Sequence, residues 1–446
     1  MKMDLEKTKQ TILSLLRGAG KKSLILLQKT NEVFLPLLNT PNTLFLILLL
    51  VPFCKPSSLE YYPWLNRLFQ LWKIASLVYL ACALLPPYLK QRPKDILKGL
   101  PKGILGLGVF WLVYLLGCLY SGAEIVSIST AAAGCGLLLL LIFYEVRLGN
   151  GMQLLRAMTW LFTACILCHV LSVFFVSWGW LRFDPKNSGI YLYGYDNYSA
   201  FFLYPMLCVI LFYSNLRYNR ISLWCWGLLL TVAFINIYTK SVAAAGVGIL
   251  LILLFLFKKY WPRLGKFLQA RYTLIALAFF LVLICVFHVQ NLLAFLLDKL
   301  GKGVTLNSRT IIWDYALRLF IKRPLLGYGA FTAQQIKNYI LYGTTHAHNV
   351  LLELLIRTGL VGTVGYLRFL CGFAKKERAL YDTKADVLLI GLIVQLVLSF
   401  MDFYPTILVF YCFMGCLYNA DSLCAEATKN PAEPAKRWSL KREKTL

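Results

Sequence analysis

The stretch THAHNVLLELLIRTGLVGTVG, residues 345–365, combines a long apolar run with ionisable side chains. His346 and His348 stand at its start, in a chain that has only four histidines. Glu353 and Arg357 follow inside the run, four residues apart, so they can pair on one helix face. Ionisable residues within a membrane span are costly and suggest a function. Two interpretations stay open: a functional pair, or a self-satisfied pair that locks helix packing.

The composition of the whole chain is that of a membrane protein. Of the 446 residues, 59% are hydrophobic and 15% are charged, whereas soluble domains carry about 25% charged residues. The sequence therefore predicts an all-α polytopic membrane protein. Thirteen cysteines lie mostly in apolar runs. Cys165 and Cys168 form a C-x-x-C without flanking ligands, so packing is favoured over a zinc or redox site.

Hydropathy predicts about 12 transmembrane helices, because a helical span needs about 20 apolar residues. The twelve segments are roughly 33–54, 67–88, 103–121, 125–144, 157–180, 198–215, 221–238, 241–257, 272–290, 348–369, 385–402 and 405–420.

Lys and Arg residues gather on one side of these segments. With the N-terminus inside, the inner segments hold 31 of the 46 Lys and Arg residues, and the short outer loops hold five. The positive-inside rule then places both termini in the cytoplasm of a multi-pass protein of the cytoplasmic membrane. The net charge of +26 is thus mainly an orientation signal, with attraction to anionic membrane lipids added. Nucleic-acid binding is disfavoured because no aromatic-basic module is present.

The predicted organisation has five parts. They are a cytoplasmic basic N-terminus (1–32), a nine-span membrane region (33–290), a large extracytoplasmic loop (291–347), a three-span region (348–420) and a cytoplasmic basic tail (421–446).

The large outer loop is expected to carry function, because long structureless loops are uncommon. Within it, SRTIIWDYALRLFIKRP (308–324) has apolar residues at helical spacing. Ser308 is the expected N-cap and Pro324 the stop signal. The segment predicts an amphipathic helix on the outer membrane face, with Arg318 and Lys322 toward headgroups.

Three interpretations of His348 stay open. It is a structural histidine at a helix start, a metal ligand with His346, or a general base. A lone H-x-H without a nearby third ligand is a weak metal signal. A helix N-terminus disfavours imidazolium and so suits a neutral base. Asn349 can cap the helix, and Gly359 and Gly362 should let a neighbouring helix approach closely.

The region from about 300 to 365 resembles the O-antigen ligase and O-antigen (Wzy-type) polymerase family. The family pattern is His, then Asn, Ser or Gln, nine residues, and Gly-x-x-Gly, which here spans His348 to Gly362. Upstream the family shows Ser-Arg, an aliphatic pair and Trp, then Pro and Gly-x-Gly. These residues are Ser308, Arg309, Ile311, Ile312, Trp313, Pro324, Gly327 and Gly329.

The resemblance implies a metal-independent, inverting glycosyltransferase without a cofactor. It would move glycan from an undecaprenyl-diphosphate-linked donor onto a sugar hydroxyl of a glycan or lipid-glycan acceptor, at the outer face of the cytoplasmic membrane. His348 matches the family's proposed catalytic base, and Arg309 matches an arginine thought to bind the diphosphate. The resemblance serves polymerase and ligase alike, and it admits a chain-length regulator as a partner.

Other candidate substrate-binding residues are Ser308, His346, Asn349, Lys240 and Asp196. Family members commonly carry Ser-Arg-Gly in a mid-chain span, whereas this chain has Lys-Ser-Val, so Lys240 is the expected replacement for a second arginine. Asp196 either contacts sugar hydroxyls or caps the sixth span.

The alternative function is a lipid-linked oligosaccharide flippase or transporter. Twelve spans would suit a transporter, but its usual sign is an inverted repeat with broken helices in matching halves. The sequence shows no such symmetry.

Overall fold

The computed structural model describes residues 35–86, 100–123, 125–184, 189–261, 269–285, 308–373, 380–381 and 383–429. The described residues are predominantly helical, with an isolated bridge between Tyr191 and Gly194. The predicted basic N-terminus, the start of the outer loop and most of the C-terminal tail lie outside these ranges.

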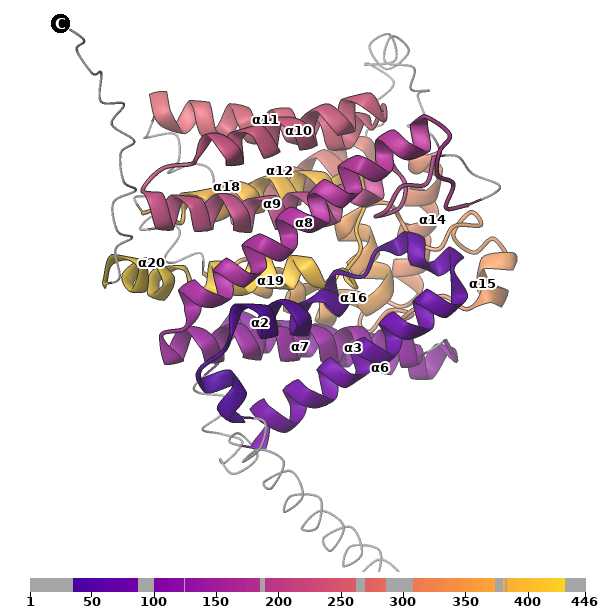
Figure 1. Ribbon diagram of the computed structural model, residues 1–446. Coiled ribbons are helices and arrows are strands. Elements are labelled where there is room, and N and C mark those ends of the chain that lie inside the picture. The colour runs from indigo at the N-terminus through magenta and orange to yellow at the C-terminus, as the bar shows by residue number, and fades with distance from the viewer. Residues whose placement is uncertain are drawn as a thin grey trace, which may run out of the picture.

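The helices follow one another along the chain without an intervening sheet (Figure 1). Their bounds are α2 Thr43–Leu50, η1 Val51–Cys54, η2 Ser57–Tyr61, α3 Pro63–Leu84, α6 Lys102–Ser121, α7 Ile125–Leu148, α8 Gly151–Ser177, α9 Asp196–Tyr218, α10 Leu223–Tyr238, α11 Val242–Tyr260, α12 Ala270–Cys285, α14 Arg309–Lys322, α15 Ala333–Lys337, α16 Val350–Leu370, α18 Asp386–Met401, α19 Leu408–Tyr418 and α20 Ala420–Lys429.

Six of the described helices are long and apolar enough to span a membrane, or up to seven if the bent pair α19 and α20 forms one span. Five more apolar helices are shorter. Each of the twelve predicted segments overlaps a helix, whereas six or seven described spans, and not twelve, have the length and hydropathy of a full crossing. The chain is an integral membrane protein.

Helix α9 lies at the centre of the bundle. Its apolar window is 89% buried, and it packs against α8, α18 and α19. In contrast, only 28% of the corresponding window of α3 is buried. Helix α3 therefore presents apolar side chains outward, as expected where the surrounding solvent is lipid.

Helix α16 is broken at Gly359, which has φ 57° and ψ −163°. Residues 324–329 dock into this break. The amides of Leu360 and Val361 donate to the carbonyls of Pro324 and Leu325 at 2.7 and 3.2 Å. The amides of Tyr328 and Gly329 donate in turn to Ile356 and Arg357, at 2.9 and 2.8 Å. Four hydrogen bonds therefore replace those that the helix loses at the break.

This break corrects the prediction for Gly359 and Gly362. A Cβ on Gly359 would lie 2.3 Å from the carbonyl carbon of Leu325, and one on Gly362 would meet Thr358 of the same helix. Close approach of two helices occurs instead between Gly365 and Gly106 of α6, where a Cβ on Gly106 would lie 2.5 Å from the Gly365 carbonyl oxygen. Gly359 of the Gly-x-x-Gly signature thus makes room for the backbone of residues 324–329, whereas Gly362 lies against Thr358 of its own helix.

Helix α14 forms where predicted and ends before Pro324, but its apolar face is turned into the protein. Trp313 is fully buried and Ile312 nearly so, and the helix packs against α16 and α12. Ser308 occupies the N-cap position with φ 66°, but its side chain makes no cap hydrogen bond. The helix that the sequence predicted on the outer membrane face is therefore, in part, a core element of the protein.

We expect Gly359→Ala to lower the free energy of unfolding by roughly 3 kcal/mol or more. The new Cβ would meet the Leu325 backbone and would adopt a left-handed φ that alanine disfavours. The matched control is Gly136→Ala in α7, where an added Cβ meets nothing within 4 Å.

Thermal unfolding of both variants in detergent measures the difference. The control should match or slightly exceed the wild type, because alanine favours helix. Equal melting temperatures for the two variants would contradict a strained, clamped Gly359.

Candidate active site

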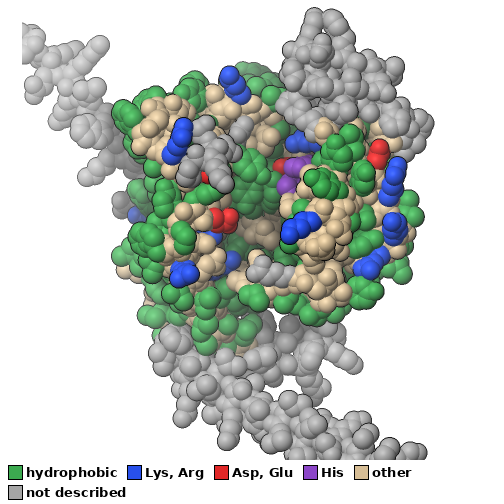
Figure 2. All heavy atoms as spheres, turned by 90° about the vertical axis from the view of Figure 1, so that its right-hand side faces the viewer, with side chains coloured by type: hydrophobic (Ala, Val, Ile, Leu, Met, Phe, Trp, Pro, Cys, Tyr) green, Lys and Arg blue, Asp and Glu red, His purple; other side chains and the backbone are tan. Residues whose placement is uncertain are grey.

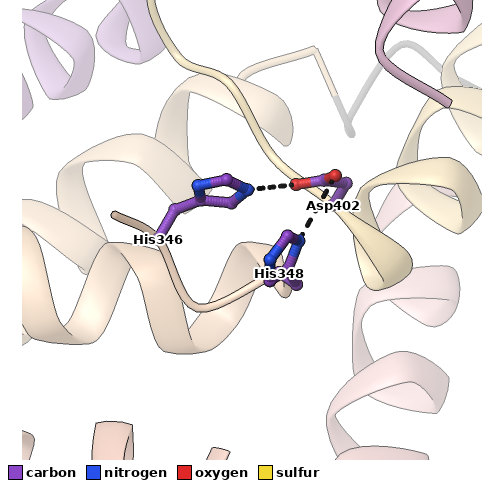
Figure 3. Close-up of side chains that lie close together, drawn as sticks. All are labelled: His346, His348 and Asp402. Atoms are coloured by element: carbon purple, nitrogen blue, oxygen red, sulfur yellow. Dashed lines mark ion pairs between the residues drawn. The ribbon is translucent and has the colours of Figure 1, made fainter. Parts of the chain in front are cut away.

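Asp402 brings His346 and His348 together. The two histidines lie on the loop before α16, and Asp402 directly follows α18. His346 Nε2 is 3.3 Å from Asp402 Oδ1, and His348 Nδ1 is 3.5 Å from Asp402 Oδ2. Figure 3 shows the two rings reaching the carboxylate from different sides. Figure 2 shows the histidines at the edge of a hollow in one end of the molecule.

The two imidazoles differ in which nitrogens are engaged. His346 uses both: Nδ1 lies 2.8 Å from the Thr345 hydroxyl, and Nε2 faces Asp402 and the Tyr404 hydroxyl. His348 faces Asp402 with Nδ1 at ion-pair distance but without hydrogen-bond geometry. No described residue is hydrogen-bonded to His348 Nε2. His348 is thus the imidazole with a nitrogen left for a substrate.

The carboxylate of Asp402 stays ionised. Burial would raise its pKa, but the neighbouring His346 and His348 outweigh burial and hold the pKa well below its usual range. Tyr404 donates its hydroxyl to Asp402 Oδ2 at 2.9 Å. Burial and the Asp402 charge raise the pKa of Tyr404 far above its usual value, so the phenol remains a donor.

A buried ion pair holds the histidine loop. Arg357 Nε donates to Glu353 Oε1 at 2.8 Å, as their spacing predicted. Glu353 Oε2 accepts the Ala347 amide, between the two histidines, at 2.7 Å. Arg357 also donates to the backbone carbonyls of Gly329 and Thr345. These contacts favour the structural interpretation of the pair.

Two further hydrogen bonds fix the same loop from opposite sides. The Trp313 indole of α14 donates to the Ala347 carbonyl at 3.0 Å. Asn349 caps α16 by accepting from the amides of Leu351 and Leu352, and its side-chain amide donates to Phe400 in α18 at 3.0 Å. His348 itself has φ 52°, in the left-handed region. Backbone strain of a positive φ persists only where the surrounding structure enforces it, here through the hydrogen bonds that fix this loop.

Arg309 lies next to the cluster, at the first position of α14. Its guanidinium donates to Met401 Sδ at 3.2 Å, and it is close enough to Asp402 to interact with the charge of that carboxylate. A thioether is a weak acceptor. The other donors of the guanidinium have no hydrogen-bond partner among the described residues.

The other predicted substrate-binding residues are less closely gathered. Lys240 is exposed in the turn between α10 and α11, with φ 59°. The next residue, Ser241, donates to Asn197 at 2.6 Å, which ties this turn to the start of α9. The side chain of Asp196 lies outside the described residues. Tyr198 of α9 reaches the cluster, because its ring packs on Tyr404 with centroids 4.6 Å apart.

The three groups could also hold a metal ion. One ligand atom from each of His346, His348 and Asp402 lies within 4.8 Å of the others. Two imidazoles and a carboxylate are a donor set that suits zinc. The sequence shows no third ligand close to His346 and His348, and in the structure Asp402 supplies one.

Asp402 and Tyr404 were not predicted from the sequence as site residues. A signal was present, because Asp402 is an ionisable residue at the end of the predicted span 385–402. Nothing in the sequence indicated that it would meet residues more than 50 positions earlier.

Helices that can span a membrane and a His–Asp cluster at one end of them define a polytopic membrane protein with a candidate acid–base site. Residues 225–367 match the family model described as O-antigen ligase. The match covers this third of the chain and supports the resemblance to the O-antigen ligase family that the motifs indicate. Comparison with curated proteins gave no match. Asp402 lies beyond the matched residues.

Removal of either partner of the Glu353–Arg357 pair should destabilise the protein. We expect Arg357→Met alone to cost about 3–5 kcal/mol, because it leaves a carboxylate buried without its cation. The double variant Glu353→Leu with Arg357→Met should recover part of this loss.

Unfolding in detergent, followed for the single and double variants, measures the coupling. The pair Lys55–Glu60, whose glutamate side chain is 68% exposed, is a control, and Lys55→Met should cost about 1 kcal/mol or less. Strictly additive losses at Glu353 and Arg357 would contradict a coupled pair.

Proposed function

We propose that the chain transfers glycan from an undecaprenyl-diphosphate-linked donor onto a sugar hydroxyl, with His348 as the general base. The observation that carries the proposal is the arrangement of His348, whose Nδ1 faces Asp402 while Nε2 has no partner among the described residues. A carboxylate on one imidazole nitrogen orients the ring and stabilises the imidazolium that forms.

In the proposed reaction the acceptor hydroxyl gives its proton to His348 Nε2. The acceptor oxygen forms a bond to the anomeric carbon of the donor sugar, and the bond from that carbon to the diphosphate breaks. Undecaprenyl diphosphate leaves with the electron pair. Direct displacement of this kind inverts the anomeric configuration.

The leaving diphosphate needs positive charge beside it. Arg309 is the candidate, because it adjoins the cluster and its planar fork suits phosphate oxygens. Lys240 stays a candidate for a second contact at the same end of α9. Asp402, Tyr404 and His346 act as positioning residues, since they form one connected hydrogen-bonded group around the carboxylate.

The break in α16 does not favour the flippase alternative. Broken helices in transporters line a substrate path, whereas this break is filled by the backbone of residues 324–329. The expectations of an outer-face site, of both termini inside and of the five-part organisation remain proposals. So does the choice between polymerase and ligase.

The decisive experiment compares His348→Ala with His346→Gln in purified full-length protein held in nanodiscs. We expect His348→Ala to lower transfer by between about 100- and 10,000-fold, the usual contribution of a general base. His346→Gln should cost less, because it acts through Asp402. The readouts are glycan length on gels and released undecaprenyl diphosphate, with melting temperature as the folding control.

Near-normal transfer by His348→Ala together with loss in His346→Gln would exchange the two roles. A wild type that moves the lipid between leaflets without product would replace the transferase by a flippase. A glycan ladder from donor alone indicates a polymerase, and product only with a separate lipid-glycan acceptor indicates a ligase.

Metal removal tests whether the His346, His348 and Asp402 cluster acts as a metal centre. We expect transfer to survive treatment with a chelator, and micromolar Zn²⁺ to inhibit it, because zinc would occupy the imidazole nitrogens. Activity that is lost on chelation and restored by Zn²⁺ would instead make the cluster a metal centre.

A further inference from the structure

A cavity of about 930 Å³ lies between α8, α9 and α10, away from the histidine cluster. Figure 1 shows α8 running obliquely to α9 and α10, so that α8 diverges from these two helices toward the left of the view. The lining combines arginines, hydroxyl groups and aromatic rings. It includes Arg156, Thr159, Trp160, Tyr213, Arg217 and Trp224.

The cavity and the cluster lie at opposite ends of α9. Tyr198 at the start of the helix packs on Tyr404 beside the cluster, and Arg217 lies in its last turn. At 1.5 Å per residue these two residues are separated by about 28 Å. That distance matches the hydrocarbon core of a bilayer, about 30 Å. The cavity therefore lies at the membrane boundary opposite the cluster.

The polar part of the cavity suits an anion with several oxygens. Arg156 and Arg217 come from different helices, yet both act electrostatically on the Tyr213 hydroxyl. Thr159 is independent evidence for a bound ligand, because its Oγ1 is buried and makes no hydrogen bond with any described residue. Two guanidinium groups and an unused hydroxyl can bind a phosphate diester, with Arg providing charge-assisted hydrogen bonds.

The rest of the cavity suits the acyl part of a lipid. Trp160 and Trp224 are 62% and 57% exposed, and tryptophans at the boundary of the bilayer form the aromatic belt of membrane proteins. A soluble anion has no apolar group to contact these tryptophan rings. An anionic phospholipid would place its phosphate between the arginines and its chains along the tryptophans.

We propose that this cavity binds the headgroup phosphate of an anionic phospholipid from the leaflet opposite the histidine cluster. The site is separate from glycan transfer, so its test does not depend on the proposed function. The excess of Lys and Arg in the chain, with a net charge of +26, favours an anionic over a zwitterionic lipid.

The test adds short-chain phosphatidylglycerol or phosphatidylcholine to delipidated full-length protein and follows melting temperature and lipid retention by native mass spectrometry. We expect phosphatidylglycerol to stabilise the wild type. The double variant Arg156→Gln/Arg217→Gln should weaken its binding roughly tenfold or more. The matched control Arg147→Gln/Arg220→Gln removes two exposed arginines at the same end that do not line the cavity, and it should bind like the wild type.

Thr159→Val separates a binding role from a structural one. It should weaken phosphatidylglycerol binding while leaving the lipid-free melting temperature equal or higher, because it removes a buried hydroxyl without a partner. Three results would overturn the proposal: equal stabilisation by phosphatidylcholine, equal loss in the control pair, or stabilisation by inorganic phosphate alone.

Discussion

The docking of residues 324–329 into the break of α16 is the contact on which the candidate site depends. In a membrane, backbone groups that a break frees must find partners within the protein. Here the partners are the backbone groups of one short segment, reached only because Gly359 adopts a left-handed conformation. The same segment carries Gly329, where a Cβ would lie 2.3 Å from the backbone nitrogen of Cys118 in α6. One insertion thus joins α16, α6 and the end of the outer loop.

The position of the histidines follows from this arrangement. Arg357 lies just before the break and donates to the Gly329 carbonyl of the inserted segment. Its partner Glu353 accepts the amide of Ala347, so the histidine loop is tied to the same point. The cluster is then completed from a different part of the chain by Asp402 and Tyr404. A rigid loop facing a buried carboxylate is the arrangement that orients an imidazole without blocking its second nitrogen.

The sequence predicted the helices well and the contacts between them poorly. Apolar runs locate helices because hydropathy is a local property, and α14 could be placed from its apolar spacing and Pro324 alone. The buried face of Trp313 was missed because an amphipathic pattern does not distinguish a lipid surface from a protein partner. Gly359 was assigned to helix packing because spacing does not reveal φ. The Glu353–Arg357 pair could be predicted from its spacing, and the motifs made His348 and Arg309 candidates, whereas Asp402 required the tertiary structure.

The order in which the chain is synthesised affects how α16 enters the membrane. Residues 324–329 leave the ribosome about 30 residues ahead of Gly359, a matter of seconds at roughly 5–20 residues per second. The two halves of α16 cannot cross lipid with the amides of Leu360 and Val361 exposed. The segment that receives them is already synthesised when they emerge, and the short chain between makes their meeting entropically cheap. Membrane integration of α16 is therefore expected as a unit with its preceding loop, not as an independent hydrophobic helix.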